Sequence, residues 1–138
     1  MQTILRILER AGGYRPALYL KIENPPYMAL VIEAVPEPGP LNLPAISIAH
    51  YGEQNGDLMR APEMCFELSK PLCSQVLSAY YYRNDYMGVE QFSRYRDGAN
   101  YVFVPDLYEE HEAFARLWDK NIRDQGFLEA FTDKSIRG

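Results

Sequence analysis

Hydrophobic residues recur with a helical period at both ends of this chain and with a period of two between them. Near the N-terminus, the apolar positions predict a helix over about residues 3–12, with Thr3 as its N-cap and Gly12-Gly13 as its stop. The period of two then predicts a series of strands, bounded by Pro, Gly and Asn, over residues 17–23, 27–35, 45–53, 58–68, 75–83, 87–95 and 101–104.

The C-terminal quarter of the chain returns to the helical period. Asp106 and Glu109 form an acidic variant of the capping box just after Pro105, which predicts the start of a long helix. Its apolar face consists of Leu107, His111, Phe114, Ala115, Trp118 and Ile122. Gly126 then interrupts this helix, and Phe127, Leu128 and Phe131 predict a last short helix or turn.

Strands that follow one another through tight turns favour an antiparallel sheet. We therefore predict an α+β fold, with an antiparallel sheet of about five or six strands built from hairpins. The N-terminal and C-terminal helices should pack on one face of it. The chain has the usual length of one domain, which we place over residues 1–138. Pro62 interrupts the strand 58–68, so this strand should lie at a sheet edge or contain a bulge.

The first long hairpin should turn at Asn55-Gly56, because this dipeptide tolerates positive φ at both central positions of a type I′ turn. Its tip gathers an unusually polar set after a buried strand, namely His50, Tyr51, Glu53, Gln54 and Asp57. A second hairpin, between strands 75–83 and 87–95, should turn at Asn84, Asp85 and Tyr86, with Arg83 beside it.

Composition and charge narrow the classes of function. Eleven Tyr, six Phe and one Trp make up 13% of the chain, and tyrosine suits sheet faces and half-wet binding surfaces. The formal net charge is −5 and the pI is about 5.0, which makes nucleic acid an unlikely partner because such binding depends on Lys and Arg. No His pair has metal-ligand spacing, and we expect no metal and no cofactor.

Cys65 and Cys73 are too few for a disulfide framework and are expected to be reduced thiols. The N-terminal stretch carries charges and no small-residue cleavage site, and no segment reaches the roughly 18 apolar residues of a membrane span. We therefore expect a cytoplasmic protein that does not bind a membrane.

Three segments resemble one protein family. They are His50-Tyr-Gly-Glu-Gln-Asn-Gly-Asp-Leu-Met-Arg-Ala-Pro-Glu-Met64, Arg83-Asn-Asp-Tyr-Met-Gly-Val-Glu-Gln91 and Leu117-Trp-Asp-Lys-Asn-Ile-Arg-Asp-Gln-Gly-Phe127. The family comprises small bacterial proteins of unknown function, encoded mainly on conjugative plasmids and integrative elements. The resemblance covers nearly the whole chain and implies a mobile-element accessory protein of the cytoplasm. It implies no catalytic residues.

The residues themselves favour a non-enzymatic module that binds a protein partner through its polar hairpin tips. Tyrosine and arginine are enriched at the centres of protein interfaces, and neighbouring hairpins could bring the two tips together. The candidate partner-binding residues are Tyr51, Glu53, Gln54, Asn55, Asp57, Arg83, Asn84, Asp85 and Tyr86.

Two other hypotheses stay open. His50 with Glu53, Asp57 and Glu63 could form the acidic site of a metal-dependent hydrolase or nuclease, although His50 alternates with apolar residues on one strand face. The aromatic run Tyr80–Tyr86 could stack on single-stranded nucleic acid, although it has few basic residues and also suits sheet packing.

Overall fold

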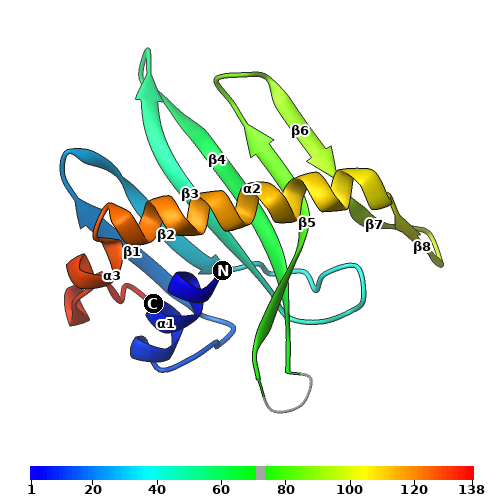
Figure 1. The fold of residues 1–138 in the computed structure, drawn as a ribbon, viewed down its shortest axis with the longest axis horizontal. Helices are drawn as coiled ribbons and strands as arrows, with labels where there is room; N and C mark the ends of the chain where they lie inside the picture. The colour runs from blue at the N-terminus through cyan, green and yellow to red at the C-terminus, as the bar shows by residue number, and fades with distance from the viewer. Residues whose placement is uncertain (71–73) are drawn as a thin grey trace.

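The computed structural model describes residues 1–70 and 74–138, and its helices and strands follow the predicted order (Figure 1). The elements are α1 (Gln2–Arg10), β1 (Tyr19–Asn24), β2 (Tyr27–Ala34), β3 (Ala45–Gln54), β4 (Asp57–Ser69), β5 (Val76–Asn84), β6 (Val89–Phe92), β7 (Arg94–Asp97), β8 (Asn100–Phe103), α2 (Pro105–Asp124), α3 (Phe127–Ala130) and the 3₁₀ helix η2 (Asp133–Ser135).

Strands β1 to β6 form one antiparallel sheet in which every strand pairs with its neighbour in the sequence. The predicted α+β class and strand number are therefore confirmed. Such a meander places the β1–β2, β3–β4 and β5–β6 connections at the same end of the sheet, which is the upper end in Figure 1. Strands β7 and β8 form a separate ribbon beyond β6.

The helices cover one face of the sheet, and α2 runs across the strands (Figure 1). The core between them is apolar because alternate residues of the central strands point toward the helices. Fully buried side chains of this core include Ile4, Leu8, Ile32, Ile48, Phe66 and Phe127. We call the opposite side of the sheet the open face.

Pro62 lies in a bulge of β4, which is a central strand and not an edge strand. Ala49 pairs with Glu63 and Tyr51 pairs with Arg60, so two residues of β4, Ala61 and Pro62, lie opposite the single residue between Ala49 and Tyr51. Of the two predicted alternatives, a sheet edge or a bulge, the structure shows the bulge.

Both predicted helix caps are wrong. The first helix begins at Gln2, and Thr3 lies within it, where its backbone N–H donates to the Asp119 carboxylate of α2 at 3.1 and 3.2 Å. The long helix begins at Pro105, so Asp106 lies in its first turn and no side chain caps it. Pro105 suits this start because the first helical N–H has no partner inside the helix.

The predicted strand 87–95 is two strands, because β6 pairs with β5 as expected but the chain bends at Ser93 and continues as β7 in the separate ribbon. Ser93 is fully buried, and its hydroxyl lies 2.9 Å from Nδ1 of His111 on α2. Its N–H donates to Tyr80 O and its carbonyl accepts from Val104 N. These bonds hold Ser93 against α2 instead of letting it continue the sheet.

The outer edge of β1 is covered by the C-terminal residues. Ile136 forms a bridge with Leu20, and the Arg137 N–H donates to Tyr19 O at 2.8 Å. These contacts pair part of the outer edge of β1. None of the helices within the described residues is long and apolar enough to cross a bilayer.

Candidate functional site

The three hairpin ends at one end of the sheet contain most of the residues that the sequence singled out. Asn55 and Gly56 have φ values of 53° and 84°, so the predicted turn with two positive φ values is confirmed. Gln54 and Asp57 form the last pair before this turn. Glu53 pairs with Leu58 one step below it.

The second hairpin turn is bound to β4 at the stem of the first hairpin. The Asp85 N–H donates to Arg60 O at 2.8 Å, and the Arg60 N–H donates to Asp85 Oδ2 at 2.8 Å. Arg83 Nε also donates to Asp85 Oδ1, at 2.6 Å. The bond from the Arg60 backbone, and then the Arg83 guanidinium, hold the pKa of Asp85 below its usual range. The structure thus joins the second tip to the stem of the first and not to its turn.

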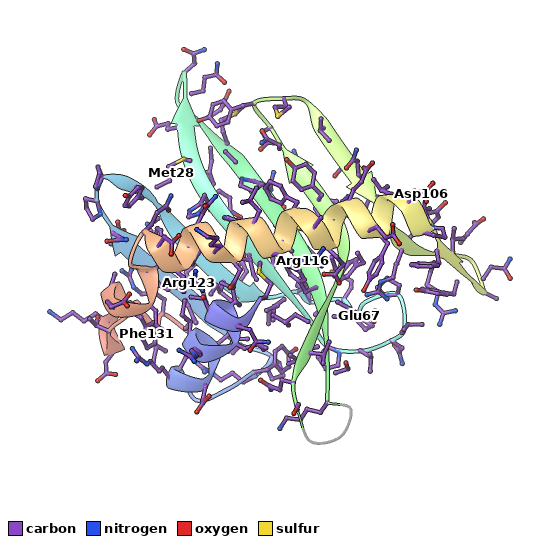
Figure 2. The ribbon with its side chains drawn as sticks, viewed as in Figure 1. Met28, Glu67, Asp106, Arg116, Arg123 and Phe131 are labelled. Carbon is purple, nitrogen blue, oxygen red and sulfur yellow. The ribbon has the colours of Figure 1, made fainter. Side chains whose placement is uncertain are left out.

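A third contact brings in the β1–β2 hairpin. A Cβ atom on Gly52 would lie 2.6 Å from the Tyr86 hydroxyl and 3.0 Å from Met28 Sδ, so these two side chains meet over Gly52. Met28 is labelled in Figure 2, near the upper end of the sheet. Glycine at position 52 leaves the space that lets Tyr86 reach across β4 to β3.

Large apolar side chains are exposed on all three hairpins at this end of the sheet. Leu58 and Met87 are 68% and 71% exposed, and Tyr27, Met28 and Tyr86 are each more than two-fifths exposed. We define the hairpin-end surface as these five residues together with Gln54, Asn55 and Asp57. This surface comes from three successive hairpins that end at one end of the sheet, and it combines exposed apolar side chains with the polar residues of the β3–β4 turn.

His50 faces the helices. It is buried, and the centre of its ring lies 5.7 Å from that of the Trp118 ring and 5.4 Å from that of the Phe127 ring. Its Nδ1 lies 3.2 Å from Met28 O and 3.3 Å from Ala29 O, and since carbonyl oxygens only accept, Nδ1 carries the proton. Burial lowers the pKa of His50, so the ring is neutral at pH 7.

The structure does not bring the four residues of the predicted hydrolase site together. Glu63 lies on the open face, where its carboxylate accepts from Ser47 Oγ at 2.6 Å and lies 3.2 Å from Arg60 Nε. Glu53 and Asp57 flank the exposed turn, and His50 lies in the helix-facing layer. Within residues 1–70 and 74–138, no three His, Cys, Asp or Glu side chains are placed to hold a metal ion.

The tyrosines of the run 80–86 have separate roles. Tyr82 packs in the helix layer, 5.3 Å from Phe114 and 5.9 Å from His111. The Tyr81 hydroxyl donates to Glu90 at 2.5 Å on the open face. The ring of Tyr80 lies 5.9 Å from the guanidinium carbon of Arg94. Tyr80, Tyr81 and Tyr82 therefore have separate partners inside the protein and do not form one continuous stacking surface.

Cys65 is a free, buried thiol, and burial followed by the Glu63 charge raises its pKa to about 12. A thiol with this pKa is not a nucleophile at neutral pH. Cys65 is therefore reduced, as expected. Cys73 lies outside the described residues.

Two features were missed by the sequence analysis. One is a buried ion pair in which Arg94 lies 2.6 Å from Glu67, the latter labelled in Figure 2. The other is a cavity of about 440 Å³ on the open face, lined by Tyr19, Lys21, Ala29, Val31, Glu33, Tyr51, Gly52, Glu53 and Leu58. The sequence offered one indication of this cavity. Alternate residues of two predicted strands, Tyr19 with Lys21 and Val31 with Glu33, should lie on the same face of the sheet.

Comparison with known proteins identifies a family without an assigned activity. A family model described as "Domain of unknown function (DUF6908)" matches residues 2–128. No curated protein and no solved structure matches the chain.

Proposed function

The chain belongs to the DUF6908 family, and from this premise we propose that it is a non-enzymatic module that binds a protein partner through the hairpin-end surface. We further propose that it serves as a cytoplasmic accessory protein of a mobile genetic element. Support for the second part comes from the resemblance of the segments His50–Met64, Arg83–Gln91 and Leu117–Phe127 to proteins encoded on such elements.

The observation that carries the binding proposal is the concentration of exposed apolar side chains at one end of the sheet. The exposed side chains come from three hairpins that end at the same end of the sheet, and two of them, Tyr86 and Met28, meet at Gly52. The set is Leu58, Met87, Tyr86, Tyr27 and Met28. Exposed apolar groups that gather in one place inside a polar rim are typical of protein interaction sites. Tyrosine and methionine are also enriched at such interfaces.

The junction is held in place before any partner arrives. The backbone bonds between Asp85 and Arg60 fix the second turn, and Tyr86 rests against the backbone of Gly52. A surface that is already ordered loses less conformational entropy on binding. The carboxylates of Glu53 and Asp57 beside it favour a partner with a basic rim.

The test is affinity capture from a host that carries a conjugative element and from the same host cured of it. The partner that the wild-type protein captures is purified, and its binding is then measured directly. Leu58→Glu and Met87→Glu place charges in the hairpin-end surface and should abolish the capture of this partner. Leu117→Glu is the matched control because Leu117 is 57% exposed on α2, away from the hairpins.

Loss of the partner in both hairpin variants, with retention in Leu117→Glu, supports the binding proposal. Equal capture by all four proteins would contradict it. A partner recovered only from the host with the element supports the mobile-element role. One recovered equally from the cured host contradicts that role but leaves the binding surface intact.

A further inference from the structure

The cavity on the open face has a wall of long side chains around a floor of small ones. Ala29 and Val31 of β2 form the floor, while Tyr19 of β1 and Tyr51 of β3 contribute aromatic rings. The volume of about 440 Å³ is enough for a small organic group. The helices lie on the other side of the sheet, so the cavity opens away from them (Figure 1).

Two carboxylates, of Glu33 and Glu53, line this cavity. The side chain of Glu33 is half-buried, and no hydrogen bond or ion pair from the described residues reaches its carboxylate. The cation in the cavity wall, Lys21, lies 3.5 Å from Glu23 and is partly exposed. The Lys21 ammonium is thus paired with Glu23 and not with Glu33.

The nearest guanidinium is also bound elsewhere. Arg60 lies 3.2 Å from Glu63 and 3.6 Å from Asp85, so its single charge faces two other carboxylates. Glu33 therefore has no cation in direct contact among the described residues. Burial, followed by the Glu63 charge, raises the pKa of Glu33 above its ordinary value, and the Arg60 charge offsets only part of this rise.

We propose that this cavity binds an alkylammonium group, with the ammonium at Glu33 and its alkyl chain along Ala29 and Val31. The rings of Tyr19 and Tyr51 add the attraction of an aromatic face for a cation. The ammonium would supply the charge that Glu33 lacks. Such a group can come from a free alkylamine or from a lysine side chain of another protein. The site goes beyond the partner surface, since Glu33, Tyr19 and the floor residues lie outside it and only Leu58 belongs to both.

The experiment is an NMR titration of the full chain with n-butylammonium, putrescine and Nα-acetyl-lysine amide. n-Pentanol is the uncharged analogue of the first probe. We expect saturable shifts around the cavity in the millimolar range for the amines and none for the alcohol. Glu33→Gln keeps the shape of the side chain and should weaken amine binding roughly tenfold, because a charge-assisted bond is lost. Glu129→Gln, an exposed acid on α3, should leave binding unchanged.

Tighter binding of putrescine than of the lysine derivative identifies a free amine as the natural source, and the reverse order identifies a lysine side chain. Either order supports the proposal. No saturable shift with any amine, equal binding of n-pentanol, or equal affinity in Glu33→Gln and the wild type would overturn it. Because Glu33→Gln leaves the hairpin-end surface unchanged, capture of the protein partner by this variant separates failure of this proposal from failure of the proposed function.

Discussion

Among single residues, Arg94 and Glu67 make the densest set of polar contacts in the protein core. Arg94 donates to Ala79 O at 3.0 Å and to Ser78 O at 3.1 Å, besides its contact with Glu67. The second oxygen of Glu67 accepts from the backbone N–H groups of Leu41 and Leu43 at 2.8 and 3.3 Å. The pair therefore ties the loop before β3 to strands β4, β5 and β7, and each charge is satisfied by several bonds.

Removing one member of this pair should be costly. Arg94→Met leaves the buried Glu67 carboxylate uncompensated, and we expect a loss of about 3–5 kcal/mol in the free energy of unfolding. Urea unfolding at pH 7 measures it. Arg116→Met, at an exposed position of α2 labelled in Figure 2, is the control and should change stability by less than about 0.5 kcal/mol. Similar losses in the two variants would mean that the pair contributes little.

At the scale of elements, α1 depends on α2 for its N-terminal cap. Met1, the residue before the helix, makes no capping bond, and the Asp119 carboxylate accepts from the N–H groups of Thr3 and Ile4. The negative charge also lies at the positive end of the helix dipole. The Asp119 side chain thus caps the start of α1 and binds α1 to α2.

Asp119→Ala should therefore lower the free energy of unfolding by about 1–2 kcal/mol. Asp119→Asn should lose less, since it keeps the acceptor oxygen without the charge. Asp124→Ala removes an exposed carboxylate of the same helix, in a surface ion pair with Lys120, and should cost clearly less stability than Asp119→Ala. Chemical denaturation of the three variants gives the comparison, and a loss for Asp124→Ala as large as that for Asp119→Ala would contradict the capping role.

The strands were predictable because each has local determinants, whereas the caps and the break at Ser93 depend on distant residues. The period of two and the Asn55-Gly56 turn lie within a few residues of the structure they specify. The cap of α1 comes from a residue 116 positions away, and Ser93 is held by His111, eighteen positions further on.

The same distinction explains the sites. The polar residues of the hairpin ends were visible in two stretches of sequence, and the Asn55-Gly56 turn was correct. Of the exposed apolar residues only Tyr86 was a candidate. Its contact with Met28 at Gly52 was missed, because these residues meet only once three hairpins are aligned. His50 was expected on an apolar face from its alternation with Ile46 and Ile48, and it is buried there.

At the scale of the whole molecule, both histidines are enclosed between the sheet and the helices. His50 packs against Trp118, and His111 of α2 packs against Tyr82, with its Nε2 3.1 Å from the Gln91 side-chain oxygen. Burial lowers the pKa of each below its ordinary value of 6.5. Neither ring can become protonated in the folded protein as readily as in the unfolded chain.

The stability of the protein should therefore fall as the pH drops below about 6.5, because the unfolded chain then binds protons that the folded protein does not. Each histidine contributes a slope of at most about 1.4 kcal/mol per pH unit, until the pH reaches its folded-state pKa. The pKa of Glu33 is raised, so above its ordinary value of 4.5 this group makes the folded protein more stable as the pH falls. The pH dependence of the wild-type protein alone therefore does not separate the contribution of the histidines from that of Glu33. Urea unfolding between pH 7.5 and pH 5 should show a clearly flatter dependence in His50→Asn/His111→Gln, even though that variant is less stable at pH 7. Parallel curves for the variant and the wild type would show that the two rings do not set the acid limit of this fold.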